Sequence, residues 1–145
     1  KYVPWSAFVR DDAVHFKGTS HRLIDLLIHN REMFVLKPLE GFGGKGVLIG
    51  KDMPFDVWGE AVKRALQPGN EHVVQEIVPI PQDEFPEFEN GRYVGFKKKN
   101  VNLNLWAFNG HFGGAFVRAS SDSVINISRG GGLCPVYYVR GKKVV

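Results

Sequence analysis

Cysteine is almost absent from this sequence, since Cys134 is the only one among 145 residues. A single cysteine excludes an internal disulfide and fits a reducing compartment such as the cytoplasm. Long apolar runs are also missing, because no stretch approaches the roughly 18 residues that a membrane-spanning helix needs. We therefore expect a cytoplasmic protein without a membrane anchor. The chain begins at Lys1 without a methionine, and we expect it to be a piece of a longer protein.

Several familiar catalytic and binding patterns are absent as well. The five histidines show no metal-ligand spacing, which argues against a zinc site. The G-x-S-x-G nucleophile elbow of the serine hydrolases is missing. The chain has no P-loop, because Lys45 is followed by Gly46 and Val47 rather than by Ser or Thr and a helix. No helix is expected directly after the glycines, which excludes the dinucleotide-binding fingerprint.

The composition is that of an ordinary globular chain, with 43% hydrophobic and 23% charged residues. The length suffices for one domain with a real core or for two small lobes. The net charge of +4 suits an anionic ligand such as a nucleotide or a nucleic acid. Composition alone does not choose between these ligands.

Hydrophobic spacing predicts an α+β fold. A helix is expected from a cap at Thr19 or Ser20 to about Arg31, and another from about Asp52 to Pro68. The expected strands are 33–37, 46–50, 72–78, 101–107, 114–119, 123–127 and 135–139, with 1–18 as an extended lead-in. In 101–107 the apolar residues alternate with polar ones, which predicts one buried face. Asn109-Gly110 predicts a hairpin turn. The prolines of 79–89 predict an irregular loop with exposed acidic residues at Asp83, Glu84, Glu87 and Glu89.

The most informative stretch is FVLKPLEGFGGKGVLIG, residues 34–50. It predicts two strands joined by a loop that holds Gly41, Gly43, Gly44, Lys45 and Gly46. Glycine lets backbone N–H groups approach phosphate oxygens closely, so such a loop is suited to cover a polyphosphate. Lys37 ends an otherwise apolar strand and is costly to bury without an anionic partner. The plain alternative is a glycine-rich hairpin with a solvated lysine.

Two further segments have weaker signals. The backbone of 75–78 leaves a strand where it could bind an adenine edge between Ile77 and Val78, although Glu76 would also suit water at a sheet edge. Arg118, Asn126 on a neighbouring strand and a glycine cluster at 130–132 that Arg129 opens would suit a transferred phosphoryl group. Each feature alone is more typical of an ordinary surface.

Taken together, the order of these segments resembles the ATP-grasp enzymes, from about Met33 to about Val139. That order is a lysine strand, a glycine-rich lid, a helix, VVQE, and a sheet with arginine, asparagine and glycines. With YVPW at the front, the chain looks like the circularly permuted members related to glutathionylspermidine synthase. The resemblance implies an ATP-grasp-like α+β fold with antiparallel or mixed sheets. Two small lobes, about 19–80 and about 90–145, would enclose a nucleotide cleft.

The resemblance also implies roles for individual residues. Lys37 would bind the α- or β-phosphate, the glycine loop would cover the β- and γ-phosphates, and Arg118 would be the catalytic residue that neutralises the transferred phosphoryl group. The residues implied for ATP binding are Lys37, Gly41, Gly43, Gly44, Lys45, Gly46, Gln75, Glu76, Ile77, Val78 and Asn126.

The implied activity is that of an ATP-dependent ligase, with ATP and Mg²⁺ as cofactors. A carboxylate would become an acyl phosphate, which an amine attacks. The family's metal ligands, an Asp and a Glu-x-Asn set, are not found here, because no glutamate stands two positions before Asn126. We expect them in the remainder of the full-length chain, so that this piece is inactive alone.

Two other functions remain open at this stage. One is a catalytically silent ATP-grasp-like module that binds a nucleotide or a partner without turnover. The other is a basic nucleic-acid-binding domain, suggested by Lys97–Lys99 after the aromatic Tyr93 and Phe96. We interpret the three lysines as a solvated basic loop, which makes nucleic acid the less favoured partner.

Overall fold

The computed structural model describes residues 3–127 and 131–137, and it shows an α+β protein whose described strand pairs are all antiparallel. The chain divides into two compact units, residues 1–79 and residues 80–145. Each unit has its own four-stranded sheet. Neither of the α-helices in the described part of the chain is long and apolar enough to cross a membrane.

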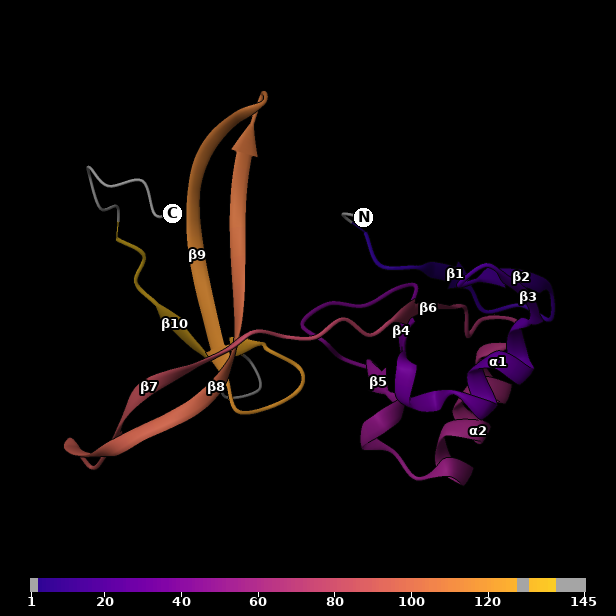
Figure 1. Ribbon diagram of the computed structural model, residues 1–145, viewed down its shortest axis with the longest axis horizontal. Coiled ribbons are helices and arrows are strands. Elements are labelled where there is room, and N and C mark those ends of the chain that lie inside the picture. Colours follow the sequence, from indigo (N-terminus) through magenta and orange to yellow (C-terminus); the bar gives the residue numbers. More distant parts are fainter. Residues whose placement is uncertain (1–2, 128–130, 138–145) are drawn as a thin grey trace. The chain divides into compact units, whose positions relative to one another are not determined.

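The sheet of the first unit has the strand order β1-β6-β4-β5 (Figure 1). Its strands are β1 (Ser6–Phe8), β4 (Phe34–Pro38), β5 (Leu48–Ile49) and β6 (His72–Glu76). A separate hairpin pairs β2 (Ala13–Phe16) with β3 (Thr19–Arg22), and the helices are α1 (Leu23–His29) and α2 (Phe55–Ala65). Short 3-10 turns, η1 (Arg31–Met33) and η2 (Gly50–Asp52), follow α1 and β5.

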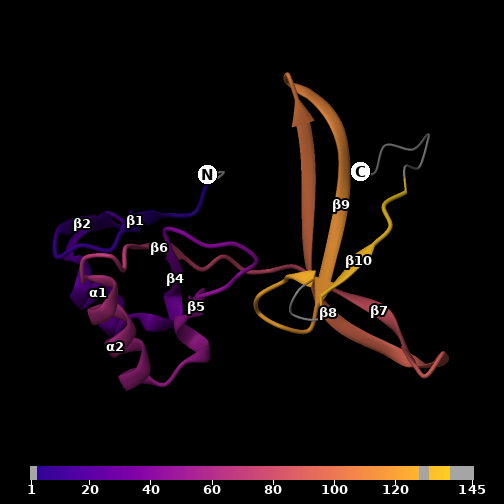
Figure 2. The same cartoon turned by 180° about the vertical axis from the view of Figure 1, so that it is seen from behind.

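One face of this sheet forms the core of the unit. Phe34, Leu36 and Val74 stand on this face and are fully buried. The two helices lie next to each other in Figure 2. The core residues that they contribute are Leu23, Leu26, Leu27, Trp58, Val62 and Ala65. The opposite face of the sheet carries Lys37 and Gln75 together with the apolar Val35, Val73 and Phe8.

The predicted helices are confirmed, but the start of the first one was wrong. Thr19 and Ser20 belong to β3, and α1 begins only at Leu23, after Arg22, which makes no side-chain capping bond. Lys17 and Gly18, both with positive φ, form the turn between β2 and β3. Thr19 and Ser20 therefore belong to a hairpin strand and do not cap a helix. The lead-in is likewise more ordered than predicted, because β1 pairs with β6.

The second unit is an antiparallel sheet with the order β10-β9-β8-β7. Its strands are β7 (Gln82–Glu89), β8 (Arg92–Phe108), β9 (His111–Ser120) and β10 (Gly132–Cys134). The predicted hairpin turn is confirmed, because Asn109 and Gly110 have φ values of 49° and 78°, which a type I′ turn requires. Toward this turn only β8 and β9 remain paired, as Figure 1 shows for the long orange arm.

Burial in this second sheet differs from the prediction. Leu103 and Leu105 are 55% and 66% exposed, although we expected their face of the strand to be buried. Asn102 and Asn104 on the other face are half-buried instead. The cause is that Arg118 reaches from the neighbouring strand over the two amides.

The interpretation of 79–89 as a loop is confirmed for 79–81 but was wrong for 82–89, which form β7. Cross-strand pairing overrides the prolines, because Pro86 lies on an edge strand, where its missing N–H is tolerated. The lysines of 97–99 also lie on a strand and not in a loop, and Lys99 forms a 2.8 Å ion pair with Glu87. Glu87 is consequently half-buried rather than exposed.

The expected strands near the end were misplaced. Residues 123–127 form bends and a turn, so that Asn126 is not on a strand. Among the described residues the last strand is 132–134, and 135–137 of the predicted strand 135–139 have no regular structure. Gly132 therefore belongs to a strand instead of a nest. Residues 138 and 139 of that prediction lie outside the described part of the chain.

Candidate nucleotide site

The structure brings together two of the predicted ATP-binding residues, Lys37 and Gln75. Lys37 on β4 and Gln75 on β6 lie on the same sheet face, diagonal to one another, because Lys37 is opposite Val73 and Gln75 is opposite Val35. The Lys37 Nζ donates a 2.6 Å hydrogen bond to Gln75 Oε1. This face is opposite the one that packs against the helices, and Lys37 and Gln75 share it with Val35, which is only 9% exposed.

A further residue, Ser6, is hydrogen-bonded to Gln75 on the side away from Lys37. Gln75 Nε2 donates to Ser6 Oγ at 3.0 Å, and Ser6 Oγ donates in turn to the Pro4 carbonyl at 3.2 Å. The chain of bonds fixes the amide with its oxygen toward Lys37. The sequence contained no signal for Ser6, because its strand has three residues and no apolar alternation.

The structure separates Glu76 from Lys37 and Gln75. Glu76 pairs with the buried Phe34 and lies on the helix-covered side of the sheet, where Lys17 approaches its carboxylate at 3.5 Å. The backbone N–H of Ile77 is already bonded to the Met33 carbonyl at 2.8 Å. Val78 is 49% exposed beyond the end of β6. Of the segment predicted for adenine, Gln75 is therefore the member on the lysine face.

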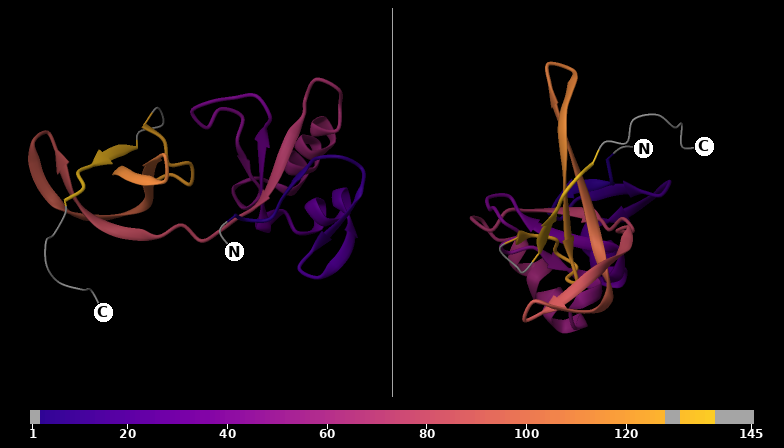
Figure 3. Two further views of the ribbon diagram at one scale, coloured as in Figure 1. Left: turned by 90° about the horizontal axis from the view of Figure 1, so that it is seen from above. Right: turned by 90° about the vertical axis from the view of Figure 1, so that its left-hand side faces the viewer.

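The glycine loop connects β4 and β5 and extends past their ends, as the purple segment of Figure 3 shows (left). Gly43, Gly44 and Gly46 have φ values between 66° and 73°, a region that costs other residues backbone strain. Lys45 is exposed, and its Nζ lies 5.2 Å from the ring centre of Phe42. Pro38 contacts the loop from its base, since a Cβ on Gly41 or Gly46 would meet its ring at 3.4 or 3.1 Å.

Arg118 lies in the second unit, on β9. Its Nη2 donates to the side-chain oxygens of Asn102 at 3.2 Å and Asn104 at 3.0 Å, and its guanidinium lies 5.4 Å from the centre of the Phe116 ring. Arg118 Nε is enclosed and has no hydrogen-bond partner among the described residues. Sequence reasoning missed the two asparagines, although their spacing by two on one strand was visible.

Asn126 contacts the glycine cluster. The Asn126 carbonyl accepts a 2.9 Å hydrogen bond from the Gly131 N–H, and a Cβ on Gly131 would meet that carbonyl oxygen at 2.7 Å. This close approach explains the glycine. Arg129 and Gly130, which we expected to open the cluster, lie outside the described residues.

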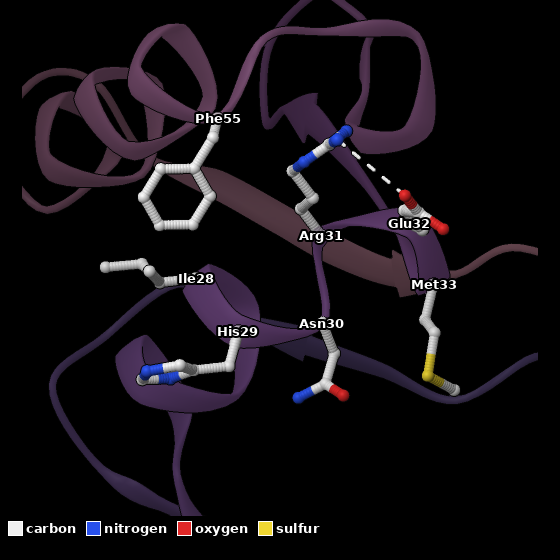
Figure 4. A pocket seen from close by; sticks show the side chains of 7 residues that line it. All are labelled: Ile28, His29, Asn30, Arg31, Glu32, Met33 and Phe55. Atoms are coloured by element: carbon white, nitrogen blue, oxygen red, sulfur yellow. Dashed lines mark ion pairs between the residues drawn. The ribbon is translucent and has the colours of Figure 1, made fainter.

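A pocket of about 260 Å³ lies elsewhere on the first unit, between the end of α1 and the start of α2 (Figure 4). It is lined by Ile28, His29, Asn30, Arg31, Glu32, Met33 and Phe55. Arg31 is directed toward the Glu32 carboxylate at 3.7 Å and donates to the carbonyls of Gly50 and Met53. None of the predicted ATP-binding residues lines this pocket, and Arg31 is used in joining η1 to η2.

The described residues contain no group of three or more His, Cys, Asp or Glu side chains that could hold a metal ion. No family model matches this sequence, and no curated protein matches it either. A function for this chain therefore has to be argued from the local geometry of Lys37, Gln75 and the glycine loop.

Proposed function

We propose that this chain is the ATP-binding portion of an ATP-grasp-like ligase, which activates a carboxylate as an acyl phosphate for attack by an amine. The observation that carries the proposal is the hydrogen bond between Lys37 and Gln75. It places a half-buried ammonium group with a neutral partner on the sheet face opposite the helices.

The neutral partner matters because it leaves the lysine charge in place. Burying an ammonium group costs free energy unless an opposite charge compensates for it. Lys37 forms no ion pair within the described part of the chain, and the nearby carboxylate of Glu76 lies on the other face, with Lys17. A phosphate group would supply the missing negative charge, in the manner of other phosphate-binding lysines.

The loop between β4 and β5 adds donors next to this lysine, since it begins directly after β4. Three glycines of this loop have positive φ, and loops with such backbone turns can form nests of N–H groups that bind anions. Lys45 at the exposed part of the loop adds a second cation. In the proposed cleft, Lys37 binds an α- or β-phosphate oxygen and the loop covers the β- and γ-phosphates.

In the reaction that we propose, a carboxylate oxygen attacks the γ-phosphorus and ADP leaves. The amine then attacks the acyl carbon, and phosphate leaves. We assign no Mg²⁺ ligand, because the described residues hold no group of three or more His, Cys, Asp or Glu side chains that could bind a metal ion. The metal ligands, the carboxylate and the amine are proposed to belong to the remainder of the protein and its substrates.

Calorimetric titration with Mg·ATP tests this proposal. We expect the chain to bind ATP and Lys37→Ala to weaken binding about tenfold, which corresponds to about 1.4 kcal/mol. The matched control is Lys63→Ala, since Lys63 lies on α2 and is ion-paired with Glu60 on an exposed surface. This control should bind ATP as the unchanged chain does.

Equal losses in Lys37→Ala and Lys63→Ala would show that only net charge attracts ATP, and the proposed site would be wrong. No heat of binding with either the chain or a full-length protein would reject the ATP-grasp assignment. ATP binding in the full-length protein without ADP formation would favour the catalytically silent module instead.

A further inference from the structure

The arm of β8 and β9 has a face that joins an arginine, two amides and two aromatic rings. We call it the Arg118 site and define it by Asn102, Asn104, Trp106, Phe116 and Arg118. Strand register places Asn102 opposite Arg118, Asn104 opposite Phe116 and Trp106 opposite Gly114. All five side chains therefore stand on one face, in three successive rungs of the ladder.

The guanidinium of Arg118 is held without being neutralised. Its two hydrogen bonds go to amide oxygens, at 3.2 Å and 3.0 Å, and it forms no ion pair with the carboxylates of the described residues. Asn104 Nδ2 donates to Asn102 Oδ1 at 2.7 Å, which fixes the orientation of the amides. One Nη2 atom makes both bonds of Arg118, and Nε is enclosed without a partner in the described part of the chain, which leaves the N–H groups of Nη1 as donors for a ligand. The site consequently contains a cation of fixed orientation that still has unused N–H donors.

An apolar surface adjoins this cation. The ring of Phe116 lies under the guanidinium, and Trp106 meets Phe116 edge-on with ring centres 5.6 Å apart. Trp106 is 53% exposed, so that its ring is accessible from solvent. Arg118 and Trp106 stand two rungs apart on this face, and successive rungs are roughly 7 Å apart at about 3.4 Å per residue. The Arg118 side chain extends toward Trp106 by one rung, because its Nη2 bonds to Asn104 and its guanidinium lies over Phe116. About one rung therefore separates the guanidinium from Trp106. A carboxylate attached to a single aromatic ring has dimensions of this order.

We propose that the Arg118 site binds an aromatic monocarboxylate, with the carboxylate on Arg118 and the ring against Trp106. Arginine and carboxylate form strong charge-assisted hydrogen bonds, and the exposed indole offers the ring an aromatic partner. The identification of this carboxylate as the ligase's substrate rests on the proposed function. The binding site itself does not depend on that function, because every residue involved lies on β8 and β9.

The two asparagines are positioning residues in this proposal. They aim the guanidinium while leaving its charge available, which an aspartate at the same place would not do. Asn104→Asp keeps the shape of the side chain but adds a carboxylate at hydrogen-bond distance from Arg118. We expect this substitution to compete with the ligand by pairing with the arginine.

Benzoate is the probe that we would use, titrated into the ¹⁵N-labelled chain without ATP and followed by NMR. We expect a Kd on the order of 1 mM and shifts of the Trp106 indole N–H and the Arg118 Nε–H. Acetate lacks the ring and benzamide lacks the charge, so each should bind at least tenfold more weakly. Arg118→Gln and Asn104→Asp should each weaken benzoate binding at least tenfold. Asn90→Asp, in the β7–β8 turn, makes the same charge change away from the site and should have no effect.

The remaining outcomes contradict the proposal. Acetate binding as tightly as benzoate, or Trp106→Leu without effect, would show that the ring plays no part. Inorganic phosphate binding more tightly than benzoate would make this a phosphate site. Equal binding by Asn104→Asp, or no shifts at all, would exclude Arg118 as a carboxylate anchor. Because ATP is absent, benzoate binding succeeds or fails independently of the ATP calorimetry.

Discussion

Lys37 Nζ lies 2.6 Å from Gln75 Oε1, although the two residues are 38 positions apart in the chain. The register of β4 and β6 places them on one sheet face, and Ser6 on β1 holds the glutamine from the other side. Three neighbouring strands thus contribute one residue each to a polar line across the face opposite the helices. The lysine that the sequence marked as unusual is the cationic end of this line.

Gln75→Glu tests whether the charge of Lys37 has to stay available. The substitution changes one atom group and converts the hydrogen bond into an ion pair, so the folded chain should be as stable as before or more stable. An ATP phosphate would then compete with the new carboxylate. We expect ATP binding to weaken about tenfold, or about 1.4 kcal/mol, as measured by calorimetry.

Gln75→Leu is the companion variant. It removes the hydrogen bond but leaves the lysine charge, so its effect on ATP affinity should be smaller than that of Gln75→Glu. Should both variants bind ATP equally well, the charge of Lys37 would have no part in nucleotide binding.

The parts of the fold that were predictable are those where a local pattern decides the structure. The apolar period of α2, with Trp58 and Val62 on one side, gives the helix at Phe55–Ala65. Asn109-Gly110 fixes its hairpin turn, since few other residue pairs accept two positive φ values in succession. Lys37 was predictable as a candidate because a charge at the end of an apolar strand is rare.

The features that the sequence could not reveal are those that depend on which strands pair and in which register. The sequence places Gln75 and Glu76 in one predicted segment, although adjacent residues of a strand face opposite sides of the sheet. Only the pairing with β4 shows that Gln75 is the one on the face of Lys37. The strand at 82–89 had a local signal, since Asn90-Gly91 joins it to β8 with a similar pair of positive φ values to Asn109-Gly110, but its prolines favoured a loop. Register likewise places Asn102 and Asn104 under Arg118, which no local pattern announces.

Gly50 is a position where the structure leaves no room for a side chain. A Cβ there would lie 2.0 Å from the Arg31 carbonyl oxygen, which is backbone and cannot rotate away. We expect Gly50→Ala to lower the free energy of unfolding by about 3 kcal/mol, since η1 and η2 would have to separate. Chemical denaturation followed by circular dichroism measures this change.

Gly59 provides the matched control, because it lies inside α2 and its Cβ would meet nothing within 4 Å. Gly59→Ala should raise the free energy of unfolding by about 0.5–1 kcal/mol through helix propensity. If both alanines destabilised the chain alike, the tight approach of Gly50 to Arg31 would not be the cause.

Trp58 joins the two helices by packing and by one hydrogen bond. It is fully buried, and its Nε1 donates to the Leu27 carbonyl near the end of α1 at 2.9 Å. Trp58→Phe removes the donor and leaves a small cavity, for which we expect a loss of about 2–3 kcal/mol in denaturation experiments. Val57→Ala, at a half-exposed position of the same helix, should change stability by less than about 1 kcal/mol. Equal effects would mean that α2 does not depend on this bond.

The ion pair between Glu87 and Lys99 makes the second unit sensitive to acid. The hydrogen bond from Lys99, 2.8 Å long, lowers the pKa of Glu87, and the charges of Lys99 and Lys97 act in the same direction. A carboxyl group whose pKa is lower in the folded chain stabilises the fold above its unfolded pKa of about 4.3. This contribution is lost as the pH falls through the folded pKa.

Carboxyl-carbon NMR of Glu87 during an acid titration measures this directly. We expect Glu87 to titrate below the ordinary range of a glutamate, and Lys99→Ala to move its midpoint upward. Lys98→Ala is the control, because Lys98 lies opposite Glu84 and faces the other side of β8. It should leave the midpoint nearer to that of the unchanged chain, since it removes a more distant charge that salt screens. A midpoint that Lys98→Ala raises as much as Lys99→Ala would mean that general positive charge, and not the bond across β7 and β8, lowers the pKa of Glu87.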